Sequence, residues 1–125
     1  MTIGNYQNKN YIGNDGLIHH EYFGDQTSET VEEDIRRLAG FIDTLHKQNK
    51  SAYLLLDFTN VTKQDSGARS KAYKALKTLQ YDKMAFFGMS HFLKYVAKFV
   101  VATTGMGPKV GSFGTEEEAV KWLKE

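Results

Sequence analysis

The chain has 125 residues, 16 of them basic and 15 acidic, and its formal net charge of +1 favours neither a nucleic-acid nor a polyanion partner. It has no cysteine, which excludes disulfides, thiolate catalysis and cysteine-ligated metals and fits a cytoplasmic protein. No apolar run approaches the roughly 20 residues that a membrane-spanning helix needs, and the first residues lack the blocks of a signal peptide. We therefore expect a single cytoplasmic domain over residues 1–125.

The first expected elements are two β-strands joined by a tight turn. Residues 11–12 (YI) and 17–23 (LIHHEYF) are rich in β-prone side chains, and they flank residues 13–16 (GNDG). Glycine, asparagine and aspartate adopt the backbone conformations of short hairpin turns. This pattern predicts an antiparallel hairpin.

A helix is expected next, starting at Thr30. Residues 30–33 (TVEE) form a capping-box pattern, in which the threonine and the second glutamate satisfy each other's backbone N–H groups. Apolar residues at helical spacing then form one stripe, which comprises Val31, Ile35, Leu38, Ile42 and Leu45. The helix should end near residues 48–50.

The central stretch predicts a buried strand, a polar turn and a helix. Residues 53–56 (YLLL) are apolar without alternation, as in a parallel strand covered on both faces, and Asp57 is expected to end the strand. Asn60 and residues 65–67 (DSG) supply turn chemistry. The helix then starts at Ala68, and one face of it carries Ala68, Ala72, Ala75, Leu76 and Leu79.

The last part of the chain repeats the alternation of strand and helix. Residues 83–88 predict a strand, 91–104 a helix and 109–113 a weak strand. Residues 115–118 (TEEE) form a second capping box that opens a terminal helix. Such alternation predicts an α/β fold, with a mixed, mainly parallel sheet, an N-terminal antiparallel hairpin and four helices.

The expected helix over 91–104 carries more large apolar residues than one core-facing stripe requires. Three explanations stay open. The fold covers the helix on both sides, or the helix forms a homodimer interface, or it lies over an apolar pocket or a membrane surface.

No catalytic or metal-binding motif is complete in this sequence. The four histidines show no helical i, i+4 pair, and no matched set of carboxylates accompanies them, so we expect no metal and no cofactor. Ser66 lacks the G-x-S-x-G elbow of hydrolases. Asp57 stands where a parallel sheet places ligands, but turn formation or helix capping is the simpler explanation of this carboxylate. The aromatic residues are not interleaved with basic ones, as a nucleic-acid surface requires.

Three segments of the chain resemble the STAS family, and more closely its small stand-alone SpoIIAA-like members. They are residues 54–69 (LLLDFTNVTKQDSGAR), 83–88 (KMAFFG) and 113–123 (FGTEEEAVKWL). The resemblance covers most of residues 30–125. It implies an STAS-like fold and a non-enzymatic regulatory module that binds a protein partner.

The resemblance also implies a specific site. In antagonists of anti-sigma factors, a serine or threonine that follows an aspartate at the start of the equivalent helix is phosphorylated by the partner kinase. Ser66 after Asp65 has a similar position, so Ser66 is the candidate phosphoacceptor and Asp65, Ser66, Gly67 and Arg69 are the candidate docking residues. The alternative is that Asp65 or Ser66 only caps the helix.

The same layout resembles CRAL-TRIO-type lipid-transfer domains, in which an apolar helix gates a cavity. This implies an alternative function, the binding of a lipid or another apolar molecule at the membrane, with Phe92, Val96 and Phe99 as the gate. A partner module predicts an exposed Ser66 and no sizeable cavity, whereas a lipid carrier predicts an apolar cavity. A third hypothesis, an enzyme centred on Asp57 and Ser66, predicts a base within reach of Ser66.

Overall fold

A computed structural model describes residues 7–90, 98, 102, 105 and 107–125. Five strands form one sheet in the order β1-β2-β3-β4-β5. The strands are β1 Lys9–Ile12, β2 Ile18–Gln26, β3 Tyr53–Gln64, β4 Lys83–Phe87 and β5 Val110–Phe113. β1 and β2 are antiparallel, and the other neighbours are parallel. The predicted hairpin and the mixed, mainly parallel α/β sheet are therefore confirmed.

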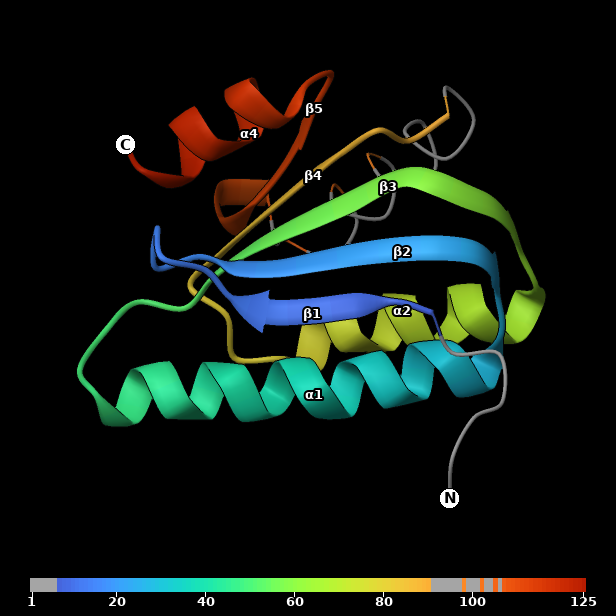
Figure 1. The fold of residues 1–125 in the computed structure, drawn as a ribbon, viewed down its shortest axis with the longest axis horizontal. Coiled ribbons are helices and arrows are strands. Elements are labelled where there is room, and N and C mark those ends of the chain that lie inside the picture. The colour runs from blue at the N-terminus through green and yellow to red at the C-terminus, as the bar shows by residue number, and fades with distance from the viewer. Residues whose placement is uncertain (1–6, 91–97, 99–101, 103–104, 106) are drawn as a thin grey trace.

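Helices cover both faces of the sheet (Figure 1). Helix α1 (Ser28–Lys47) and helix α2 (Ser66–Thr78) lie on one face, and helix α4 (Glu116–Leu123) lies on the other. The proposed gate residues Phe92, Val96 and Phe99 lie outside the described residues, and of the predicted helix over 91–104 only residues 98 and 102 are described. The described part thus contains three of the four expected α-helices.

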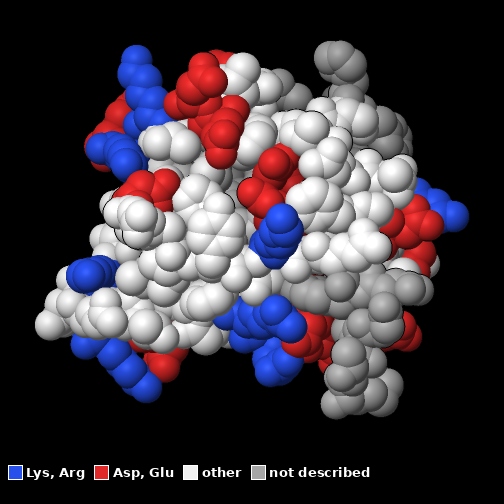
Figure 2. Space-filling model, viewed as in Figure 1, with Lys and Arg blue, Asp and Glu red and all other residues white. Residues whose placement is uncertain are grey.

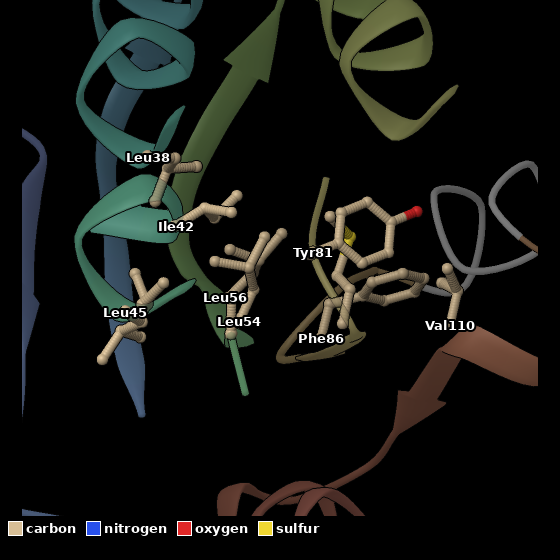
Figure 3. Close-up of a cluster of buried hydrophobic side chains, with 11 residues drawn as sticks. Leu38, Ile42, Leu45, Leu54, Leu56, Tyr81, Phe86 and Val110 are labelled. Carbon is tan, nitrogen blue, oxygen red and sulfur yellow. The ribbon is translucent and has the colours of Figure 1, made fainter. Parts of the chain in front are cut away.

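The unbroken apolar run of β3 faces two cores. Leu54 and Leu56 pack in the core beneath α1 and α2, whereas Leu55 packs in a second core beneath α4. In Figure 3, Leu38 and Ile42 of α1 lie opposite Leu54 and Leu56. Since successive side chains of a strand point to opposite faces, a strand buried on both sides needs apolar residues at every position.

Helix α1 begins at Ser28, and its N-cap lies three residues before the predicted capping residue Thr30. Thr27 is the N-cap, and its side-chain oxygen accepts the N–H of Thr30 at 3.3 Å. The Thr30 hydroxyl in turn accepts the N–H of Thr27 at 2.9 Å. The capping box therefore exists, but with threonine instead of glutamate at its third helical position, so the TVEE pattern placed it wrongly.

Strand β3 also continues beyond Asp57, which was predicted to end it. β3 runs to Gln64 because β2 offers it a long parallel partner, with pairs as far as Gln26 and Gln64. It is β4 that stops here, where Phe87 pairs with Asp57. The Asp57 carboxylate accepts the N–H of Thr59 at 2.8 Å within the strand.

Candidate functional site at the start of helix α2 and the cavity beside it

Asp65 caps helix α2. Its backbone is extended, and its carboxylate accepts the N–H of Ala68 at 2.7 Å. Its own N–H donates to the carbonyl of Gln26 at 3.1 Å, so the cap is anchored to the end of β2. Of the two residues that could have capped this helix, Asp65 therefore does so.

Ser66 is the first residue of α2, and it is exposed. Because Asp65 already satisfies the N–H group that a cap must satisfy, the helix start does not depend on the Ser66 hydroxyl. Ser66 is thus presented to solvent at a helix N-terminus. Its role as a phosphoacceptor stays a prediction.

Two substitutions test whether Asp65, and not Ser66, caps helix α2. We expect Asp65→Ala to lower the free energy of unfolding by about 1 kcal/mol, while Ser66→Ala should change it by less than about 0.5 kcal/mol. Urea unfolding of both variants measures the difference. An equal loss in both variants would mean that Ser66 shares the cap.

Gly67 and Arg69 lie beside the two capping-site residues. A Cβ atom on Gly67 would lie 3.0 Å from the Cβ of Ser28, so glycine lets the starts of α2 and α1 approach closely. Arg69 is exposed, and its guanidinium donates to the carbonyl of Gln64 at 3.1 Å. The candidate docking residues Asp65, Ser66, Gly67 and Arg69 thus form one patch where both helices begin.

Asp57 does not belong to this patch. Since a strand rises roughly 3.3 Å per residue, Asp57 lies on the order of 25 Å from Asp65 along β3. Each described histidine pairs with a carboxylate other than Asp57, as the pairs His19–Asp15, His20–Asp34 and His46–Asp82 show. His91 lies outside the described residues. The described part therefore brings together no Asp57–Ser66 catalytic arrangement.

A cavity of about 500 Å³ opens between α1, α2, β3 and β4. Its wall is mainly apolar and includes Leu38, Leu56, Phe58, Leu76, Phe86 and Met89. Polar side chains also line it, and Gln64, Arg69 and Ser70 lie together where α2 begins. The cavity and the docking patch therefore share Arg69.

The cavity exists because α2 carries small residues on its inner face. Of its predicted core stripe, Ala68 and Ala75 are buried, but Ala72 is exposed and Leu76 is only half-buried. A close-packed interior would need larger side chains at such positions to fill the space above the sheet. The alanine spacing is a sequence signal for this cavity, but it was interpreted as ordinary packing, and the apolar pocket was linked to residues 91–104 instead.

The far end of α2 is held by Tyr81. Its hydroxyl donates to the carbonyl of Leu76 at 2.7 Å, which satisfies one of the carbonyl groups left open at a helix C-terminus. Burial raises the pKa of the Tyr81 phenol to about 12, so this donor stays protonated at physiological pH. Helix α2 is thus fixed at both ends, and the cavity lies along it.

Asp34 was not predicted as a functional residue. It is a buried carboxylate of α1 in the cavity wall, and sequence periodicity had assigned the adjacent Ile35 to the core stripe. The Asn8 amide donates to Asp34 Oδ2 at 2.8 Å, and His20 Nε2 lies 3.2 Å from the same oxygen. The carboxylate thus belongs to a buried polar cluster, whose other members include Gln26 and Thr30.

Other kinds of site find no support in the described part of the chain. No group of three or more acidic or histidine side chains there could hold a metal ion. No helix there is long and apolar enough to cross a membrane. On the face shown in Figure 2, basic and acidic side chains are both widely spread, consistent with the net charge of +1.

A model of the SpoIIAA-like family matches residues 17–124, which include the docking patch, the sheet from β2 onward and all three described α-helices. The chain belongs to the SpoIIAA-like family. The resemblance stated from the sequence is therefore confirmed. A search of curated proteins found no match.

Solved structures share this fold at low identity. The unphosphorylated anti-sigma factor antagonist SpoIIAA is 13% identical with a TM-score of 0.63, over 94% of this chain and 98% of its own. The phosphorylated Bacillus cell fate determinant SpoIIAA is 18% identical with a TM-score of 0.63, over 94% and 99%. An uncharacterised Shewanella loihica protein with a SpoIIAA-like fold is 16% identical with a TM-score of 0.66, over 94% and 92%.

Proposed function

We propose that this SpoIIAA-like chain is a cytoplasmic, non-enzymatic regulatory protein that docks a protein partner through residues 65–69 and the adjoining side of α2. The observation that carries this proposal is the exposed Ser66, which stands at the helix start while Asp65 alone provides the cap. An exposed hydroxyl with no capping task is available for modification.

Phosphorylation of Ser66 is the proposed switch. A phosphate adds a charge of about −1.5 to −2, and the partial positive charge of a helix N-terminus favours it there. It would stand beside the Asp65 carboxylate, so phosphorylation would make the docking patch more negative and would also change its shape. The likeness to SpoIIAA, solved in both phosphorylated and unphosphorylated forms, supports a kinase-type anti-sigma factor as the partner.

The test uses protein isolated from its own cells. We expect peptide mass spectrometry to find phosphate on Ser66, and Ser66→Asp to weaken the binding of the co-purified partner by at least tenfold. The matched control is Ser51→Asp, which makes the same change at an exposed serine before β3 instead of after it. Equal binding by both variants, with no phosphate on Ser66, would contradict the switch.

A second candidate function is the binding of a lipid or other apolar small molecule in the cavity. The cavity itself is the supporting observation, since about 500 Å³ lies within the roughly 300–1,000 Å³ of small-molecule sites. The exposed Ser66 agrees with partner docking, whereas the cavity departs from the expectation that a partner module has no sizeable cavity and agrees with ligand binding. Peripheral membrane contact and homodimerisation were both linked to residues 91–104, of which only residues 98 and 102 are described.

Native mass spectrometry tests this second function. Protein purified from cells should carry a copurified apolar molecule, and Ala72→Phe should remove it because the larger side chain would occupy part of the cavity that Ala72 lines. The same spectrum reports whether the chain is a dimer. A ligand-free mass for the unmodified protein would leave partner docking as the remaining proposal.

A further inference from the structure

We infer that the cavity takes a single-chain amphiphile with a carboxylate head, a fatty acid, and that Arg69 binds the head. This inference rests on the second proposed function, the binding of an apolar molecule in the cavity. It adds the chemical class of the ligand, its orientation and the residue that selects it.

Arg69 differs from the other two arginines of the chain. Arg36 and Arg37 both pair with Glu33, which occupies their guanidinium groups. Among the described residues Arg69 forms no ion pair with a carboxylate, and the remaining residues of the chain include no aspartate or glutamate. A guanidinium has five N–H donors, and the described hydrogen bond of Arg69 to Gln64 uses one.

Arg69 lies at one end of the cavity, where a bound molecule can reach it. It lines the cavity beside Gln64 and Ser70, at the end where α2 begins, whereas Leu76 and Leu79 line the cavity toward the other end of the helix. The cavity therefore has a polar end with a cation and an apolar remainder. A planar guanidinium binds a carboxylate through two parallel hydrogen bonds, so a fatty acid matches both parts.

The carboxylate of Asp34 does not oppose this arrangement. Its side chain is 2% exposed, and its Oδ2 faces Asn8 at 2.8 Å and His20 at 3.2 Å. This oxygen therefore belongs to the buried polar cluster, where the Asn8 amide donates to it. By contrast, a neutral ligand would displace water from the Arg69 guanidinium without replacing the hydrogen bonds to that water. This loss would weaken binding.

The shape of the cavity agrees with an extended chain. Its lining residues on α2 run from Arg69 to Leu79, about 15 Å along the helix at 1.5 Å per residue. Residues of α1 line the same space from Val31 to Leu38. An elongated, mainly apolar site with one cationic end favours a linear alkyl chain with its head at Arg69.

The experiment compares lauric acid with lauryl alcohol, which have the same chain length but differ in head-group charge. Isothermal titration of the full chain at pH 8, below the micelle concentration, should show at least tenfold tighter binding of the acid. Arg69→Gln should lower the affinity for the acid by about tenfold and leave that for the alcohol unchanged. The control Lys74→Gln removes an exposed charge from α2 outside this cavity, and it should change neither affinity.

The outcomes separate this inference from the function on which it rests. Equal binding of acid and alcohol, unaffected by Arg69→Gln, would overturn the carboxylate assignment and leave apolar-ligand binding intact. Binding of neither compound would overturn both. An equal loss of acid binding in Arg69→Gln and Lys74→Gln would overturn the role of Arg69, since it would show a general effect of charge. Circular dichroism of each variant verifies that α2 is still folded.

Discussion

Replacing Leu54 by alanine is expected to lower the free energy of unfolding by about 2–5 kcal/mol. Leu54 is fully buried near the start of β3, the central strand of the sheet, and it packs in the core beneath α1 and α2. The loss combines the transfer energy of the removed atoms with a cavity that the rigid sheet cannot close. Chemical denaturation of the wild type and the variant measures it.

The matched control for Leu54→Ala is Leu76→Ala. Leu76 is half-buried on α2 and lines the cavity, so truncation there enlarges an existing space and creates no new one. We expect a loss of less than about 1.5 kcal/mol, because only part of the side chain leaves an apolar environment. A loss equal to that of Leu54→Ala would show that Leu76 is tightly packed, which would contradict the open cavity.

Gly88→Ala is the second change with a large expected effect, a destabilisation of about 2–5 kcal/mol. Gly88 follows β4 with φ of +78°, a left-handed conformation that costs an L-residue about 1–2 kcal/mol. A Cβ there would also lie 2.3 Å from Thr59 Oγ1 and 2.8 Å from Thr59 N. Since the second contact is with the backbone of β3, a side-chain rotation cannot relieve it, and β3 or β4 must shift.

Gly16→Ala separates the two contributions to the Gly88 prediction. Gly16 has φ of +80°, but a Cβ there would meet no atom within 4 Å. This variant should therefore lose only about 1–2 kcal/mol, from backbone strain alone. Thermal unfolding of both variants measures the difference, and equal losses would show that Gly88 does not approach Thr59 as closely as the structure indicates.

The sequence by itself determined the features that depend on local chemistry. The apolar run 53–56 predicted a strand buried on both faces, because any polar side chain there would have to enter one of two cores. The turn 13–16 predicted the hairpin, and Thr115 predicted the cap of α4, where its hydroxyl oxygen accepts the N–H of Glu118 at 3.2 Å. Each prediction was confirmed because the residues that determine the feature are neighbours in the sequence.

Only the tertiary structure decided the features that depend on segments far apart in the chain. The length of β3 follows from its pairing with β2, which overrides the turn-forming tendency of Asn60. The burial of Asp34 depends on Asn8, which precedes β1, and on His20 of β2. The cavity depends on the small alanine side chains of α2, which leave part of the space between the helix and the sheet unfilled. Local propensity is a property of neighbouring residues, whereas pairing, desolvation and packing volume are set by the partners that the fold brings together.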